Sequence, residues 1–315
     1  MEKKRVGVIG VGAMGKHHVR IYHGMRDVEL VGVADANEQT ANEIAAEYHT
    51  EAFTDCERLL NEDLDAVSIV VPTSLHKDIA RKAANHGVHM LVEKPIADSL
   101  SNAAAIIDAA RRENLKLMIG HIERFNPAIL KLKELISAGE LGEILSISCR
   151  RVGPYAPRIR DVGIITDLAV HDIDTISYLY GKRAMQVYSI AGNSFHVQED
   201  YASILLKYDD KRSGTVETNW LTPYKMRTLT ATGTGGVASV DYLEQSLELW
   251  KEEGRINVEI EKNEPLKIEL AQFVDAVRNG KKPSPSGEEG EYVLSVAIAA
   301  IESYQNGNTV RLNVA

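Results

Sequence analysis

The sequence of 315 residues contains few of the residue types that stabilise small or metal-bound folds. It has only two cysteines, Cys56 and Cys149, and their spacing matches neither a disulfide framework nor a zinc site. We therefore interpret both as small buried side chains and expect no metal centre. Hydrophobic residues make up 44% of the chain and charged residues 26%, which is typical of a globular protein, and the length is sufficient for two domains of ordinary size.

Long apolar runs and excess positive charge are also missing. The apolar stretch 293–301 is much shorter than a membrane span and is interrupted by Ser295. The first residues pass from charged side chains directly into a strand-like segment, without the apolar region of a signal peptide. The 36 basic and 45 acidic side chains give a net charge of −9. We therefore predict a cytoplasmic protein that has neither a membrane nor a nucleic acid as its partner.

The first part of the chain alternates apolar strands with amphipathic helices. Strands are predicted at 5–9, 28–34, 66–71, 88–92 and 116–119. Helices are predicted at 13–25, 37–48, 76–86 and 99–113. Nearly continuous apolar strands separated by helices indicate a parallel sheet that is covered on both faces.

The pattern changes after about residue 120. Helices are predicted at 126–137 and 166–180, and strands at 185–191, 202–208, 213–220 and 226–233. Several strands in succession indicate an antiparallel sheet. The sequence therefore predicts an α/β protein with two domains, at 1–121 and 122–315.

A glycine-rich loop follows the first predicted strand. Gly10, Gly12 and Gly15 fit the pattern G-x-G-x-x-G, and the loop residues Ala13 and Met14 lie between them. In this context the glycines permit a tight turn, the approach of a pyrophosphate and close packing of helix on strand. The pyrophosphate would bind at the N-terminus of the following helix.

An acidic residue completes this pattern. Asp35 ends the second strand, 20 residues after Gly15, where a carboxylate accepts hydrogen bonds from an adenosine ribose. The same carboxylate would repel a 2′-phosphate, so the predicted cofactor is NAD. The alternative is a simple glycine turn beside a surface aspartate.

Two further strand ends point to the same cofactor site. Ligands of an open parallel sheet bind beyond the carboxyl ends of its strands. Glu93 and Lys94, followed by Pro95, end the fourth strand, so we predict that Lys94 points toward the cofactor. The third strand is followed by three residues that would line the nicotinamide side: Pro72, Thr73 and His76.

The second domain contains a candidate proton acceptor. Asp167 and His171 are four residues apart in a predicted helix, which places both on one face. A carboxylate beside an imidazole orients the ring and stabilises its protonated form, as a general base requires. The alternative is a surface ion pair, with Asp172 and Asp174 exposed to solvent.

Together these motifs resemble the glucose–fructose oxidoreductase/inositol dehydrogenase (Gfo/Idh/MocA) family. They occur in the family's order: "GVGAMG", "EKP", "RFNP" at 124–127, Asp167 with His171, and "ELAQFVDAVRNGKKPSPSGEEG" near the C-terminus. The resemblance covers essentially the whole chain. It implies a Rossmann domain followed by an α/β domain with an open, mostly antiparallel sheet that often forms the interface of a homodimer or homotetramer.

The resemblance also implies an activity and its residues. The expected reaction is nicotinamide-dependent oxidation or reduction of a sugar or cyclitol carbon. Lys94 and His171 would be catalytic, with Asp167 in the same hydrogen-bonding set, and Arg124 would bind the substrate. One departure from the family pattern is "VGIIT" before Asp167, where a pair of glycines is usual, so the local backbone is expected to differ.

Within the family, residues 150–174 are similar to those of microbial UDP-N-acetylglucosamine 3-dehydrogenases. Four arginines lie in or beside the loop before His171: Arg150, Arg151, Arg158 and Arg160. We predict that Arg158 or Arg160 binds the diphosphate of a nucleotide sugar, and that Tyr155 contacts its base or sugar. Alternatively, two of the arginines point to solvent or brace the loop against acidic neighbours.

Two other functions stay open at this point. A myo-inositol or free-aldose dehydrogenase would have the same fold and catalytic residues. A non-catalytic NAD-binding regulator would keep the fold and use its sheet surface for a protein partner, although the presence of Lys94 and His171 does not favour it.

Overall fold

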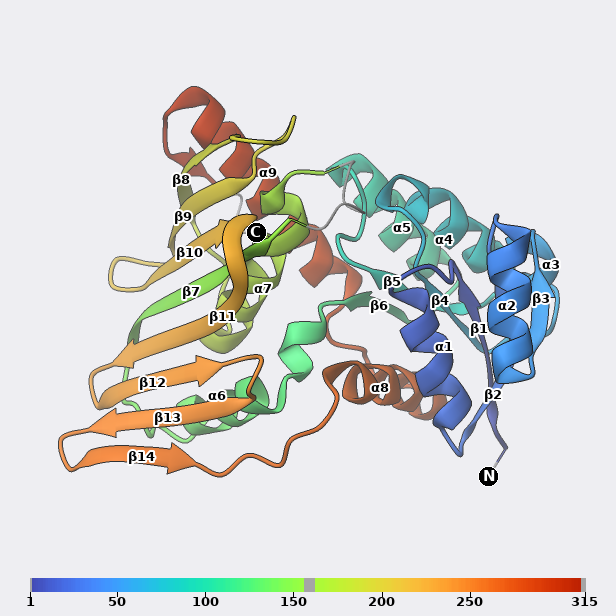
Figure 1. Ribbon diagram of the computed structural model, residues 1–315, viewed down its shortest axis with the longest axis horizontal. Coiled ribbons are helices and arrows are strands. Elements are labelled where there is room, and N and C mark those ends of the chain that lie inside the picture. Colours follow the sequence, from blue (N-terminus) through green and yellow to red (C-terminus); the bar gives the residue numbers. More distant parts are fainter. Residues whose placement is uncertain (1, 156–161, 313–315) are drawn as a thin grey trace. The chain divides into compact units, whose positions relative to one another are not determined.

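The computed structural model describes residues 2–155 and 162–312 and forms two compact units (Figure 1). The first unit comprises residues 1–121 and 266–291, and the second comprises residues 122–265 and 292–315. The division at 121/122 coincides with the predicted change of pattern. The predicted ranges did not include the return of residues 266–291 to the first unit.

The first unit contains a parallel six-stranded sheet with the order β3-β2-β1-β4-β5-β6. Its strands are β1 (Lys4–Ile9), β2 (Val28–Ala34), β3 (Glu51–Phe53), β4 (Ala66–Ile69), β5 (His89–Glu93) and β6 (Leu117–Gly120). The helices between them are α1 (Gly15–Gly24), α2 (Glu38–Tyr48), α3 (Cys56–Leu60), α4 (His76–Asn85) and α5 (Leu100–Arg112). β4 and β6 are buried along their whole length, as expected for a sheet with helices on both faces.

Side-chain caps determine where several of these helices begin. Asn37 accepts a hydrogen bond from the backbone N–H of Thr40 at the start of α2, and Ser99 accepts one from Asn102 at the start of α5. Such caps satisfy N–H groups that have no partner within the helix. The helices therefore begin directly after the loops that follow β2 and β5.

Residues 266–291 return to the first unit through helix α8 (Pro265–Asn279) and the beginning of α9 (Gly287–Asn306). Arg278 forms an ion pair with Asp27, and the backbone N–H of Ile119 donates to the carbonyl of Pro285 at 3.0 Å. A Cβ on Gly290 would lie 2.7 Å from the Ile119 side chain, so a side chain there would clash with β6. This part of the chain therefore completes the cover of the sheet.

The second unit contains a nine-stranded sheet with the order β14-β13-β12-β11-β7-β10-β9-β8-β15. Its strands are β7 (Ile144–Pro154), β8 (Gln186–Gly192), β9 (Tyr201–Lys207), β10 (Ser213–Asn219), β11 (Leu221–Gly233), β12 (Gly236–Asp241), β13 (Ser246–Lys251), β14 (Gly254–Val258) and β15 (Val310–Arg311). β7 and β10 are parallel, and the other pairs are antiparallel. The predicted Rossmann-like domain followed by a mostly antiparallel sheet is confirmed.

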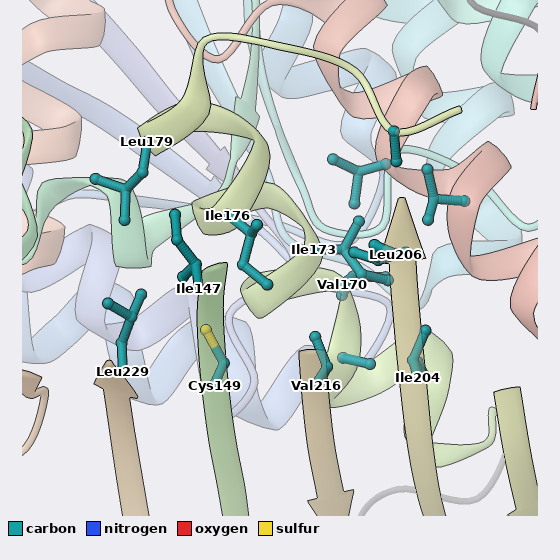
Figure 2. Packing of buried hydrophobic residues seen from close by; sticks show 14 of the residues in the cluster. Ile147, Cys149, Val170, Ile173, Ile176, Leu179, Ile204, Leu206, Val216 and Leu229 are labelled. Atoms are coloured by element: carbon teal, nitrogen blue, oxygen red, sulfur yellow. The ribbon is translucent and has the colours of Figure 1, made fainter. Parts of the chain in front are cut away.

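One face of this sheet is covered by α6 (Pro127–Ser137), α7 (Val170–Tyr180) and the later part of α9. Figure 2 shows Val170, Ile173, Ile176 and Leu179 of α7 packed on alternate residues of the strands, among them Ile147. The strand residues in this layer come from four neighbouring strands: Ile147, Cys149, Ile204, Leu206, Val216 and Leu229. As predicted, Cys149 is a small buried side chain, whereas Cys56, at the start of α3 in the first unit, is only partly buried, contrary to the prediction.

The other face carries exposed apolar side chains. The pattern in β9 alternates strictly between exposed and buried positions, and Tyr201 and Leu205 are exposed. Tyr188 of β8 is the cross-strand partner of Leu205, and Ile190 of β8 is 61% exposed. In the described residues, no helix is long and apolar enough to cross a membrane.

Candidate functional site

The glycine-rich loop connects β1 to α1. Gly10 has a φ of +86°, and a Cβ on it would lie 2.5 Å from the carbonyl oxygen of Val70. A Cβ on Gly15 would lie 1.9 Å from the carbonyl oxygen of Gly10. Gly12 is different, because nothing lies within 4 Å of the position of its missing Cβ. The loop is thus closed against the sheet at Gly10 and Gly15 and open at Gly12, where an approaching phosphate needs space.

Asp35 lies at the end of β2 beside this loop. Its two carboxylate oxygens each accept a backbone hydrogen bond at 2.9 Å, one from Val11 and one from Asn37. Gly10, Gly12, Asp35 and Pro72 together line a pocket of about 360 Å³. Asp35 retains lone pairs for further donors, since each carboxylate oxygen accepts more than one hydrogen bond. This combination of open glycine backbone and fixed carboxylate fits the pyrophosphate and ribose of a dinucleotide.

Four other residues of the predicted cofactor site lie in the loops after β1 and β4. Ala13 and Met14 lie directly before α1, and the first turn of α1, residues 15–18, contains no acidic residue. Thr73 begins a short 3-10 turn, and His76 begins α4. Binding of the cofactor by these four residues stays a prediction.

The His76 ring is engaged with the backbone. Its Nδ1 lies 3.0 Å from the carbonyl oxygen of Pro95, and its Nε2 lies 3.0 Å from that of Val71. Burial lowers the pKa of His76, against the opposing effect of these carbonyl groups. The ring joins the loops that follow β4 and β5, and a contact with nicotinamide stays a prediction.

Glu93 and Lys94 occupy the end of β5, with Lys94 half-buried. Glu93 is buried and accepts a hydrogen bond from the backbone N–H of Lys94 at 3.2 Å. Its other oxygen lies 3.2 Å from Nε2 of the fully buried His18 on α1. Burial acts to raise the pKa of Glu93, but the hydrogen bond and charge of His18, together with Lys94, lower it. Glu93, the residue directly before Lys94 in the chain, therefore carries an ionised carboxylate.

In the second unit, Asp167 lies in a π-helical turn (Ile165–Ala169) and His171 lies in the first turn of α7. The segment is helical as predicted, but its first turn is wider than an α-helix. Glu199 holds the start of this turn, because its Oε1 accepts a hydrogen bond from the backbone N–H of Ile165 at 3.2 Å. A Cβ on Gly163 would collide with the Glu199 carboxylate. π-Helical turns occur frequently at functional sites.

Asp172 and Asp174, which follow His171 in α7, are buried. Arg151 donates from Nε and Nη2 to the two oxygens of Asp172, each at 2.9 Å, and from Nη1 to Glu123 at 2.6 Å. Asp172 and Glu123 hold the pKa of Arg151 above its usual value in spite of burial. The interpretation of Asp172 and Asp174 as solvent-exposed is therefore wrong: each is paired with a buried arginine, Asp172 with Arg151 and Asp174 with Arg124.

Arg124 forms the second of these buried pairs. Its Nε and Nη2 donate to the oxygens of Asp174 at 2.7 Å and 2.6 Å, and its guanidinium lies 5.1 Å from the ring centroid of Tyr178. This pair holds α7 against the segment before α6. Substrate binding by Arg124 stays a prediction.

The loop before α7 is described only at its two ends. Arg158 and Arg160 lie outside the described residues. Tyr155 lies before that gap and forms an aromatic cluster with two other rings, at centroid distances of 3.7 Å to His196 and 5.4 Å to Trp220. Arg150 is exposed and paired with Glu217, whereas Arg151 is buried against Asp172 and Glu123. The alternative interpretation, in which arginines pair with acidic neighbours, therefore applies to Arg150 and Arg151.

Four polar residues of these sites were not predicted from the sequence: His18, Glu123, Glu199 and Arg227. His18 follows Gly15 by three residues, and Glu123 precedes Arg124, so both adjoin recognised motifs. Glu199 and Arg227 adjoin none of these motifs. Only the strand register and the fold bring them to α7.

Comparisons with known proteins agree with this geometry. A model described as "Oxidoreductase family, NAD-binding Rossmann fold" matches residues 4–121, and one described as "GFO/IDH/MocA C-terminal domain" matches residues 129–239. The chain belongs to the Gfo/Idh/MocA oxidoreductase family. It is an NAD(P)-dependent oxidoreductase whose first unit has the NAD-binding Rossmann fold, as predicted.

Individual relatives resemble the chain over nearly its full length. UDP-N-acetylglucosamine 3-dehydrogenase of Acidithiobacillus ferrooxidans is 32% identical and covers 95% of this chain and 98% of its own. A solved structure of that enzyme matches with a TM-score of 0.91 over 97% of this chain and 99% of its own. The NAD-dependent scyllo-inositol 2-dehydrogenase of Bacillus subtilis is 30% identical over 98% of this chain and 96% of its own.

Proposed function

We propose that the protein is an NAD-dependent sugar dehydrogenase that oxidises C3 of UDP-N-acetylglucosamine to the 3-keto sugar. The observation that carries this proposal is the 32% identity to UDP-N-acetylglucosamine 3-dehydrogenase over 95% of the chain. The identity to an inositol dehydrogenase is nearly as high, at 30%, so myo-inositol or another uncharged polyol is the second candidate substrate.

The preference for NAD over NADP rests on Asp35. Its carboxylate lines the pocket beside Gly10 and Gly12 and is fixed by two backbone N–H groups. In that position it would accept hydrogen bonds from the ribose hydroxyls and repel a 2′-phosphate. NAD, when bound, supplies the acceptor for the hydride that leaves the oxidised carbon.

Lys94 and His171 are proposed to act on the reacting hydroxyl. His171 would accept its proton as the general base, with Asp167 favouring the protonated ring. Lys94 would donate a hydrogen bond to the same oxygen and stabilise the negative charge that develops on it. The buried pairs of Arg151 with Asp172 and Arg124 with Asp174 hold the helix that carries His171 in one position.

A substrate screen tests this function. NADH absorbance would be followed with UDP-N-acetylglucosamine, N-acetylglucosamine and myo-inositol, each with NAD or NADP. We expect reduction of NAD with UDP-N-acetylglucosamine and much weaker reduction with the two uncharged compounds. Equal or better turnover of myo-inositol would replace the nucleotide-sugar proposal with the polyol dehydrogenase.

We also propose that the protein forms a homodimer or homotetramer through the exposed face of the nine-stranded sheet. The apolar side chains on β8 and β9, Tyr188, Ile190, Tyr201 and Leu205, support this, because exposed apolar patches commonly mark interaction surfaces. Leu205→Glu should lower the mass measured by light scattering, while Leu243→Glu, at an exposed position after β12, should not. An unchanged mass for Leu205→Glu would exclude this surface as the interface.

A further inference from the structure

Arg227 lies on β11 directly opposite Arg151 on β7. Directly opposed residues of an antiparallel pair project from the same face of the sheet. Arg151 reaches Asp172 of α7 from this face, so Arg227 projects from the face that carries α7, His171 and Asp167. Arg150, the neighbour of Arg151 in the same strand, projects from the opposite face.

The two arginines on the α7 face differ in how completely they are paired. All three side-chain nitrogens of Arg151 donate to Asp172 or Glu123, and its side chain is 2% exposed. Arg227 is 34% exposed, and its partner among the described residues is Glu123, at a long 3.5 Å from Nη1. The same Glu123 oxygen already accepts the shorter bond from Arg151, at 2.6 Å. Within residues 2–155 and 162–312, most donors of the Arg227 guanidinium are therefore unused.

The charges around Arg227 also favour the binding of an anionic group. Burial, followed by the positive charge of Arg151, lowers the pKa of Arg227, and Glu123, Asp172 and Asp167 only partly oppose this. The positive charge is therefore incompletely compensated by the protein. A ligand oxyanion would complete the compensation, and the planar guanidinium matches the geometry of phosphate and carboxylate groups.

We propose that Arg227 is a specificity-determining residue that binds an oxyanion of the substrate. If the function proposed above holds, this oxyanion belongs to the diphosphate of the nucleotide sugar. A carboxylate of a sugar acid has the same chemistry. An uncharged polyol would offer Arg227 no oxyanion, so this residue distinguishes the two classes of candidate substrate.

The test uses the full-length Arg227→Gln and Arg227→Lys variants, with Arg150→Gln as the matched control. Arg150→Gln removes the same charge from the opposite face of the sheet, where Arg150 is 46% exposed. Initial rates would be measured with UDP-N-acetylglucosamine, glucuronate and myo-inositol. Binding of UDP would be measured by calorimetry in the presence of NAD, and melting temperatures would verify folding.

Arg227→Gln should raise KM for UDP-N-acetylglucosamine and Kd for UDP roughly tenfold or more, the effect of losing a hydrogen bond to a charged group, and change kcat much less. Arg227→Lys should fall between wild type and Arg227→Gln, because it keeps the charge without the planar fork. KM for myo-inositol and Kd for NAD should not change. Arg150→Gln should leave both KM for UDP-N-acetylglucosamine and Kd for UDP unchanged.

The outcomes separate this inference from the proposed function. A wild-type enzyme that oxidises UDP-N-acetylglucosamine, combined with an unchanged KM in Arg227→Gln, overturns the role of Arg227 and leaves the proposed function intact. A wild-type enzyme that neither oxidises UDP-N-acetylglucosamine nor binds UDP refutes the proposed substrate. In that case, an Arg227-dependent KM for glucuronate assigns the oxyanion to a carboxylate, and its absence overturns the inference as well.

Discussion

The imidazole of His18 on α1 meets the carboxylate of Glu93 at the end of β5, with 3.2 Å between Nε2 and Oε1. The glycine at position 120 of the neighbouring strand leaves room for this carboxylate, because a Cβ there would lie 2.9 Å from Oε1. Glu93 also accepts the backbone N–H of Lys94. The first helix is thereby linked to the residue that we propose as catalytic.

Breaking this link should destabilise the first unit. His18→Ala leaves the Glu93 carboxylate buried without its partner, which typically costs about 3–5 kcal/mol. We expect a correspondingly lower free energy of unfolding, measured by denaturant titration. His23→Ala, on the same helix but exposed beside Tyr48, serves as control and should cost much less. Equal losses in the two variants would contradict the role of the pair.

The same pair predicts how stability depends on pH. The pKa of Glu93 is lowered in the folded protein, so its contribution is present above the pKa of the unfolded chain and is lost as pH falls through the folded-state pKa. Glu93→Gln should therefore lose stability at neutral pH and show a flatter decline in acid. Unfolding free energies at several pH values below neutrality test this. Parallel pH profiles for Glu93→Gln and wild type would show that Glu93 does not contribute.

Asp35 should determine the choice of cofactor. Asp35→Asn removes the charge that would repel a 2′-phosphate and retains one carbonyl acceptor for the loop. We expect the ratio of kcat/KM for NAD to that for NADP to fall by roughly tenfold or more, an effect of about 1.4 kcal/mol or more. Glu38→Gln removes an acidic group from the next helix, outside the pocket lining, and should leave the ratio unchanged. A wild-type preference for NADP would overturn the assignment.

Lys94 and His171 should be necessary for turnover. Lys94→Ala and His171→Ala are each expected to lower kcat roughly a hundredfold or more, the usual scale of general acid–base effects. NAD binding, followed by calorimetry, should persist in His171→Ala because the glycine loop and Asp35 are untouched. Normal turnover with an unchanged pH profile in His171→Ala would show that another group accepts the proton.

The adjacent residues Arg150 and Arg151 offer a comparison of an exposed ion pair with a buried one. Arg151→Met should destabilise the second unit by about 3–5 kcal/mol, because the buried carboxylates of Asp172 and Glu123 lose the positive charge of Arg151. Arg150→Met loses only an exposed pair with Glu217 and should cost about 1 kcal/mol or less. Thermal unfolding of both variants measures the difference, which should be absent if Arg151 is redundant.

The sequence predicted elements well where a long periodic pattern meets a clear end signal. The predicted strand 28–34 coincides with β2, and the predicted helix 37–48 coincides with α2 and its cap Asn37. β3 and α3 were not predicted, because segments of three and five residues are too short to show a period. The glycine loop and Asp35 were found because their partners are close in sequence.

Residues whose roles depend on distant partners could not be placed in this way. Asp172 and Asp174 look like surface charges in a helix, and only their arginines, 21 and 50 residues away, show that they are buried. The sequence likewise gives no sign of a role for Arg227. Only the register of β11 with β7 shows that it lies opposite Arg151. Periodicity shows which face of a helix is apolar, but not what a polar residue meets.

The return of residues 266–291 has a consequence for the synthesis of the protein. Residues 4–120 contain every strand of the parallel sheet, yet the cover over β6 is supplied by Pro285, Ser286 and Gly290. At about 5–20 residues per second, the ribosome adds these residues many seconds after β6 has been made. During that interval the nascent cofactor-binding unit exposes an apolar edge, and residues 122–265 of the second unit are translated before the first unit is complete.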